Sequence, residues 1–210
     1  MTVTQSLLAY TFAAGLLTIT PGLDTALVLR TAAVEGAKCA ALAGLGIVAG
    51  CLVWGASVAL GLGALLTASQ LAFTVLKGAG ALYLLWLGIQ MLARPRSNFA
   101  AVAGTVGQMP DRGTGWLRRG LLTNLLNPKV GVFYVSFLPQ FLPAHVAAAA
   151  YILLLAVLHA MMGLAWFAAL ILGTRPLTRL LQRPRTVRML DRTAGLVFVC
   201  FGVRLALARR

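Results

Sequence analysis

Acidic side chains are nearly missing from this 210-residue chain, which holds four Asp and Glu against 18 Lys and Arg. Charged residues of both signs supply only 10% of the sequence, whereas soluble domains hold about 25%. Hydrophobic residues supply 60%, and the mean hydropathy is +0.90. So few polar groups cannot cover a water-soluble surface. We therefore predict an all-α integral membrane protein.

The signatures of common enzymes are also missing. The chain has no GxSxG, no HExxH and no glycine-rich loop that ends in GK. Apart from Asp24, its acids are Glu35, Asp111 and Asp191, all of which we place in loops, so no pair of intramembrane acids is available for proteolysis. We expect no enzyme, no cofactor and no metal. Without an ATP site, transport would have to be driven by an ion gradient.

Cysteine is scarce, and the three that occur, Cys39, Cys51 and Cys200, form neither an even set nor a CxxC motif. A membrane thiol-redox conduit of related architecture would need reactive cysteines in the first and fourth spans, and neither span has one. That function is disfavoured but kept as an alternative. A non-transporting subunit of a larger membrane complex is a second alternative.

Long apolar runs fill most of the chain. A bilayer core of about 30 Å needs about 20 apolar residues per helix. The chain is expected to form a single membrane domain, 1–210, with halves 1–93 and 120–210 joined by a cytoplasmic linker loop, 94–119. Six spans are predicted, at 6–29, 41–66, 71–92, 120–142, 146–173 and 193–208.

Because each half has three spans, an odd number, the second half must enter the membrane in the opposite sense to the first. This is the topology of an inverted repeat. A weak internal echo agrees, since GLLTITPGLD at 15–24 resembles GLLTNLLNPK at 120–129. Small residues in the second span, Gly46, Gly50 and Gly55, favour close helix packing, and a homodimer is plausible.

Basic residues follow the predicted topology. Thirteen of the 18 fall in loops 1, 3 and 5, which the positive-inside rule places in the cytoplasm, with both termini outside. We therefore interpret the charge of +14 as topology and contact with anionic lipid, and we expect no nucleic-acid partner. The thirteen are Arg30, Lys38, Arg94, Arg96, Arg112, Arg118, Arg119, Arg175, Arg179, Arg183, Arg185, Arg188 and Arg192.

Two intramembrane prolines carry the main functional prediction. Thr20-Pro21 and Asn127-Pro128 each fit a cap followed by a proline at the start of a new helix, so spans 1 and 4 are predicted to be broken there. Broken helices in both halves are typical of a midplane site in a secondary transporter. The candidate residues at the breaks are Thr20, Pro21, Gly22, Asp24, Asn127, Pro128 and Lys129.

Structural interpretations compete with this one. Either proline could be only a kink, and Asp24 could simply pair with Lys129. Further candidates for cavity-lining positions are Tyr83, Gln90, Gln140 and His159. His159 could be a satisfied interhelical hydrogen-bond partner or part of a proton relay.

Three segments resemble the LysE/RhtB family of amino-acid exporters: 20–50, LKGAGALYLLWLGIQML at 76–92 and GLLTNLLNPKVGVFYVSFLPQF at 120–141. The resemblance implies a prokaryotic inner-membrane secondary exporter of amino acids or close derivatives that is coupled to protons. It carries functional roles to Thr20, Pro21, Gly22 and Asp24 in the first motif, and to Asn124, Asn127, Pro128 and Lys129 in the second, which Pro139 and Gln140 close. Leu23 replaces a proline that is usual in the family, which should soften the first break.

These expectations combine into a hypothesis of proton antiport by alternating access between the two halves. Asp24 is expected to bind the substrate ammonium or the coupling proton. The backbone N–H groups after Pro128, with Asn127 and Lys129, are expected to bind the substrate carboxylate.

Overall fold

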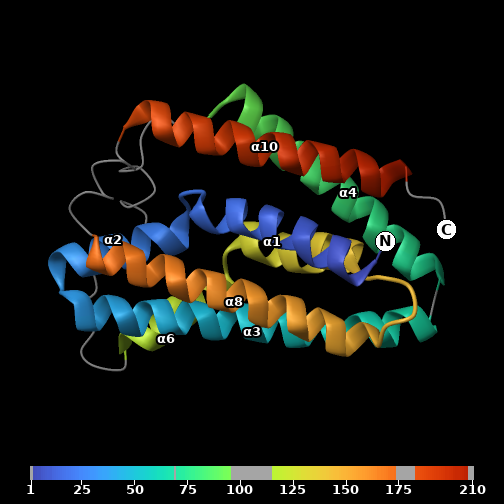
Figure 1. The fold of residues 1–210 in the computed structure, drawn as a ribbon, viewed down its shortest axis with the longest axis horizontal. Coiled ribbons are helices and arrows are strands. Elements are labelled where there is room, and N and C mark those ends of the chain that lie inside the picture. The colour runs from blue at the N-terminus through green and yellow to red at the C-terminus, as the bar shows by residue number, and fades with distance from the viewer. Residues whose placement is uncertain (1, 69, 96–114, 174–182, 208–210) are drawn as a thin grey trace.

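The computed structural model describes residues 2–68, 70–95, 115–173 and 183–207. Within these ranges every regular element is a helix, which confirms the all-α prediction (Figure 1). The elements are α1 (Val3–Ile19), α2 (Leu23–Val34), α3 (Ala37–Ala68), α4 (Gln70–Ala93), α6 (Gly115–Leu125), α7 (Pro128–Val132), the π-helix η1 (Phe133–Phe137), the 3-10 helix η2 (Leu138–Phe141), α8 (Ala148–Leu172) and α10 (Pro184–Leu207).

Membrane-spanning character is clear for part of the chain. Within the described residues, Ala37–Gly61 of α3 and the whole of α8 are long and apolar enough to cross a bilayer. Together α1 and α2 meet the same criterion as a third candidate, with a bend of 49° between them. The protein is therefore an integral membrane protein by composition and helix length, while the count of six spans stays a prediction.

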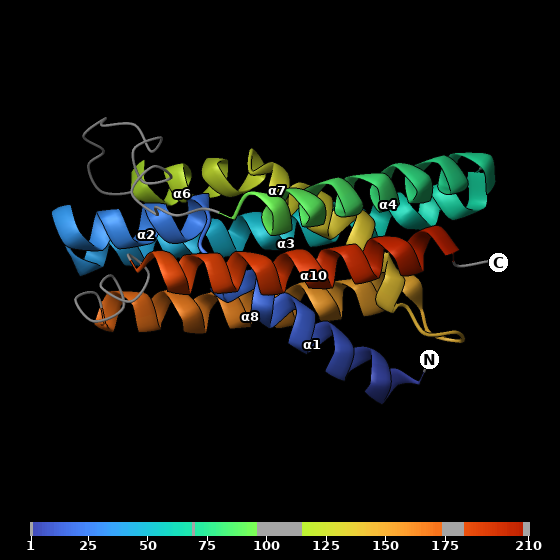
Figure 2. The same ribbon diagram turned by 90° about the horizontal axis from the view of Figure 1, so that it is seen from above.

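The helices run along the long axis of the molecule (Figures 1 and 2). Figure 1 shows α4 and α10 along one side and α3, α6 and α8 along the other, with α1 between them. The closest helix pairs are α4 with α10, and α3 with both α6 and α8. Both termini lie at the end of the bundle opposite to the α2–α3 turn.

Two predicted loops are shorter than expected. α6 begins at Gly115, inside the predicted linker 94–119, of which residues 96–114 lie outside the described part. α10 begins at Pro184, well before the predicted span at 193–208. Proline suits the first turn of a helix, and hydropathy locates the bilayer core rather than the end of a helix that projects from it. Arg118, Arg119, Arg185, Arg188 and Arg192 are therefore helical.

Asp191 was also misplaced by the sequence analysis. It lies in α10 rather than in a loop, and only 1% of its surface is exposed. Loop 1 is likewise reduced to a turn at Glu35 and Gly36, where Gly36 has φ +92°, a conformation that favours glycine. Arg30 therefore belongs to α2 and Lys38 to α3.

Glycines allow α3 to approach its neighbours closely, as the small-residue pattern predicted. A Cβ atom on Gly46 would lie 2.0 Å from the carbonyl oxygen of Leu117 in α6. A Cβ on Gly55 would lie 2.2 Å from the Cβ of Ala156 in α8. Backbones this close exclude any side chain, so these glycines fix the distances between the helices.

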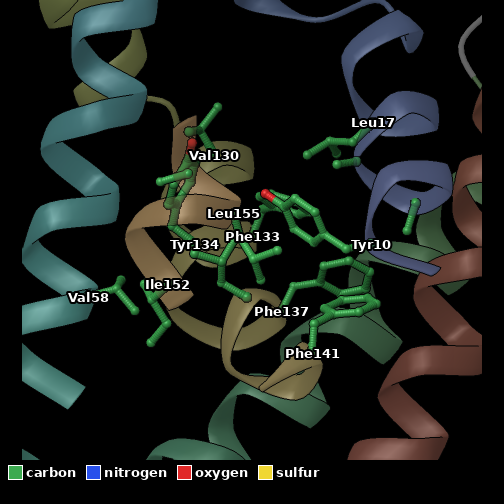
Figure 3. Packing of buried hydrophobic residues seen from close by; sticks show 14 of the residues in the cluster. Tyr10, Leu17, Val58, Val130, Phe133, Tyr134, Phe137, Phe141, Ile152 and Leu155 are labelled. Atoms are coloured by element: carbon green, nitrogen blue, oxygen red, sulfur yellow. The ribbon is translucent and has the colours of Figure 1, made fainter. Parts of the chain in front are cut away.

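An aromatic cluster fills the space between α1 and the segment that follows α7. Figure 3 shows Tyr10 from α1 beside Phe133, Phe137 and Phe141, and the Phe133 and Phe137 rings are stacked with centroids 5.0 Å apart. Every one of these rings is buried. Nearby, Tyr151 donates a hydrogen bond of 2.8 Å to Ser6, which donates in turn to the carbonyl of Phe141. The cluster therefore joins the N-terminal part of α1 to η1 and η2.

Candidate functional site

The first helix break lies between α1 and α2. α1 ends at Ile19, and the hydroxyl of Thr20 donates 2.6 Å back to the carbonyl of Leu16. The N-cap of α2 is Gly22, not Thr20 as predicted. Because the residue before a proline avoids the helical region, Thr20 is extended, and with Gly22 also extended the second helix begins only after Pro21.

The second interruption lies between α6 and α7. α6 ends at Leu125, and Asn127 caps α7 with Pro128 in its first turn. The Asn127 side-chain oxygen accepts the N–H of Lys129 at 3.1 Å, while the N–H groups of Val130 and Gly131 bond to its backbone carbonyl. These N–H groups therefore already have partners within the protein, and a substrate carboxylate would have to displace those bonds to reach them.

Asp24, in the first turn of α2, connects the two interruptions, because its carboxylate binds side chains from the end of α6 and the start of α7. Asn124 donates from its side-chain amide to one carboxylate oxygen of Asp24 at 2.8 Å, and Asn127 donates to the other at 3.3 Å. Both asparagines are buried, with 0% and 5% of their surfaces exposed. Residues about a hundred positions apart thus hold one carboxylate, and amide donors of this kind stabilise its ionised form.

Lys129 supplies the positive charge of the site. Its ammonium donates to the carbonyls of Leu17 at 3.4 Å and Thr20 at 3.3 Å. These carbonyls belong to the C-terminal end of α1, whose partial negative charge favours a cation. Lys129 also lies close enough to Asp24 for the two charges to interact. Asp24 and Lys129, which lie about a hundred positions apart in the sequence, therefore form a site with one charge of each sign.

A cavity of about 60 Å³ opens beside these charges. Five of the predicted residues at the breaks line it, namely Thr20, Gly22, Asp24, Asn127 and Lys129. The polar part of its wall comes from the end of α1, from α2 and from α7. The part that comes from α3 and α8 is mostly apolar.

A second polar pair adjoins the cavity. The side-chain amide of Asn124 also reaches the Cys51 sulfur at 3.5 Å, and the hydroxyl of Tyr134 lies 2.9 Å from Nδ1 of His159. His159 lines the cavity and is buried, so the prediction of a cavity-lining position fits. Its bond to Tyr134 also satisfies the simpler expectation of an interhelical hydrogen-bond partner.

The other predicted cavity residues lie elsewhere. Tyr83 packs its ring against Trp86 on α4, with centroids 5.4 Å apart, and Gln90 is exposed on the same helix. Gln140 donates to the carbonyl of Ser136, one turn before it. None of the three lines the cavity beside Asp24. Their positions near span ends could not show which face of the helix each one occupies.

Sequence reasoning missed most of the apolar wall. The cavity is also lined by Ile47, Val48 and Cys51 from α3, and by Ala160, Gly163 and Phe167 from α8. In a soluble protein an inward face stands out because the outward face is polar. Here the exposed side of α8 is equally apolar, with Leu154, Val157 and Met161, so no periodic signal marked the inner face.

Comparison with known proteins identifies the family of this chain. A sequence model of the LysE type translocator family matches residues 16–209. The chain is 31% identical over 201 residues to the homoserine/homoserine lactone efflux protein of Salmonella typhi, covering 96% of each. It is 32% identical over 205 residues to the leucine efflux protein of Klebsiella pneumoniae, covering 95% of this chain and 93% of that protein.

Similarity extends to the threonine efflux protein of Escherichia coli, at 32% identity over 195 residues, with 91% of this chain and 92% of the relative covered. No solved structure matches this chain. Because the family match spans nearly the whole sequence and full-length relatives exceed 30% identity, the chain belongs to the LysE type translocator family, which is a family of membrane translocators and not an enzyme class.

Proposed function

We propose that this protein is a secondary-active exporter of amino acids or close derivatives, working by proton antiport across a prokaryotic inner membrane. The observation that carries the proposal is the Asp24 carboxylate, held by Asn124 and Asn127 at the meeting point of two interrupted helices. Relatives named for the efflux of homoserine, threonine and leucine support the choice of amino acids.

The charges of the site suit a zwitterion. Asp24 would bind the ammonium group of an amino acid, and Lys129 would bind its carboxylate, because the backbone N–H groups after Pro128 are already bonded. Lys129 would have to give up its present bonds to the α1 carbonyls as the substrate enters. Those bonds would re-form in the empty site, so the Lys129 ammonium would have hydrogen-bond partners both with and without substrate.

Antiport follows from competition for one carboxylate. Asp24 can hold a proton or face a substrate ammonium, but one negative charge cannot balance both. A proton that arrives from outside would therefore favour release of the substrate, and loss of that proton to the cytoplasm would restore the substrate site. This alternation couples the downhill flow of protons to the uphill export of the amino acid.

We further propose six spans arranged as a three-plus-three inverted repeat, formed by α1 with α2, by α3, by α4, by α6 to η2, by α8 and by α10. The interruptions after Ile19 and Leu125, one in each half, support this arrangement. Exposed apolar side chains such as Leu60 and Leu172 would face lipid.

The sidedness of the proposal has its own support. The end of α2 and the starts of α3, α6 and α10, which carry many of the basic residues, lie at one end of the bundle (Figures 1 and 2). That end would face the cytoplasm. Both termini lie at the opposite end and would face outward.

The proposal is tested by transport in inverted membrane vesicles that contain the protein. With the lumen acidified, we expect accumulation of at least one amino acid from a radiolabelled panel, and we expect a protonophore to abolish it. Vesicles without the protein are the control. The proposal fails if no amino acid accumulates, or if accumulation is unaffected when the pH gradient is collapsed.

A cysteine-free variant separates transport from the thiol-redox alternative. Cys39→Ala, Cys51→Ser and Cys200→Ala together are expected to retain most of the transport, because all three cysteines are free and the serine keeps an acceptor for Asn124. The measurement is uptake in the same vesicles, with each single variant alongside. Complete loss in every cysteine variant, with normal amounts of protein, would instead support thiol chemistry.

A further inference from the structure

We infer that one face of α8, formed by Ala160, Gly163 and Phe167, sets the size and charge of the substrate side chain and restricts it to short, uncharged groups. The inference rests on the proposed function, since it names the substrate class of the same cavity.

The two ionic groups of the site would be occupied by the backbone of the substrate. Asp24 and Lys129 both lie on the α2 and α7 side, and the two charges of an amino-acid backbone would engage both of them. The rest of the wall, which a substrate side chain would face, includes Ile47 and Val48 from α3 and the three α8 residues. Its threonines, Thr18 and Thr25, are polar but carry no charge. A charged side chain placed there would lose its hydration without gaining a partner of opposite charge.

His159 does not change this conclusion. Among the titratable groups on the α3 and α8 side of the cavity, it is accompanied only by Cys51. Nδ1 of His159 is held by the hydroxyl of Tyr134, and the Cys51 sulfur receives the Asn124 amide. Neither group offers an anion to a basic side chain, and the His159 ring packs against Phe133 and Tyr134, with ring centroids 5.1 and 5.6 Å away.

The spacing of the α8 residues limits the size of the substrate side chain. Positions 160, 163 and 167 lie on one helical face, so they present an alanine methyl, an open glycine and a phenylalanine ring in succession. A cavity of about 60 Å³ has room for a few water molecules, which fits a short side chain. The Phe167 ring, only 6% exposed, closes the wall beyond Gly163.

Gly163 is the position where the wall can be thickened without strain. A Cβ added there would meet Cε2 of Phe167 at 3.9 Å, an ordinary van der Waals contact. By contrast, a Cβ on Gly50 or Gly46 would collide with α6. Gly163→Ala therefore narrows the cavity while keeping the fold, and truncation of Phe167 widens the same part.

Opposite substitutions give opposite expected shifts. In the vesicle assay, uptake of glycine, alanine, threonine, leucine, phenylalanine, lysine and glutamate is compared. Wild-type protein should carry short uncharged amino acids and exclude lysine and glutamate. Gly163→Ala should lower the ratio of leucine to alanine uptake, and Phe167→Ala should raise it, each by about tenfold, the discrimination of about one methylene.

Matched variants keep the test decisive. Gly61→Ala adds the same methyl to α3 where a Cβ meets nothing within 4 Å, and it should leave the ratio unchanged. Phe167→Leu replaces Phe167→Ala if the latter does not accumulate. Retained transport with an unchanged ratio in both α8 variants, or lysine uptake equal to that of alanine, would overturn the inference alone. Absence of uptake of every amino acid by the wild type would instead overturn the proposed function.

Discussion

Asp24→Asn is expected to abolish proton coupling and to reduce substrate uptake by about 10- to 100-fold. The substitution keeps the shape of the side chain but removes the charge that Asn124 and Asn127 hold in place. Hydrogen bonds to a charged group are worth about 1.5–3 kcal/mol, and each 1.4 kcal/mol corresponds to about tenfold in an equilibrium. A neutral amide cannot exchange a proton, so the remaining uptake should no longer respond to a pH gradient.

The measurement is uptake into inverted vesicles with and without an acidified lumen, for equal amounts of folded protein. Glu35→Gln is the matched control, because it removes another acid from this acid-poor chain at an exposed turn. That control should transport like the wild type. Undiminished proton-driven uptake by Asp24→Asn would remove Asp24 from the coupling mechanism and leave the interrupted helices without an assigned role.

Local chemistry in the sequence was a good guide to the second interruption and a poorer guide to the first. Asn127 before Pro128 predicted a cap, and the side chain of Asn127 does accept the N–H of Lys129. Thr20 before Pro21 looked the same in the sequence but closes the preceding helix instead. The difference is Gly22, whose extended backbone postpones the second helix by a position that no capping rule specifies.

Contacts between residues far apart in the chain could not be predicted from the sequence. Asp24 and Lys129 were both recognised, but the sequence did not show that Lys129 also binds the carbonyls at the end of α1. The role of Asn124 came from a family resemblance and not from any local rule. Phe167 and Gly163 could not be singled out from the sequence, because apolar residues occupy both the exposed side of α8 and the cavity wall.

Gly120→Ala is expected to prevent normal assembly of the bundle. A Cβ on Gly120 would lie 2.0 Å from the carbonyl oxygen of Ala43, a backbone atom that cannot rotate away. α3 and α6 would have to separate, and overpacking of this kind costs about 1–3 kcal/mol or more. Since α6 also carries Asn124, the displacement would weaken the hydrogen bond from Asn124 to Asp24, so transport should fall together with stability.

The same methyl group at Gly61 or Gly78 meets nothing within 4 Å and serves as the control. Alanine is favoured over glycine inside a helix by up to about 1 kcal/mol, so these controls should melt at or above the wild-type temperature in detergent. Gly120→Ala should melt several degrees lower or fail to accumulate. A normal melting temperature for Gly120→Ala would mean that α3 and α6 are not in backbone contact, and the position assigned to Asn124 beside Asp24 would then have to be abandoned.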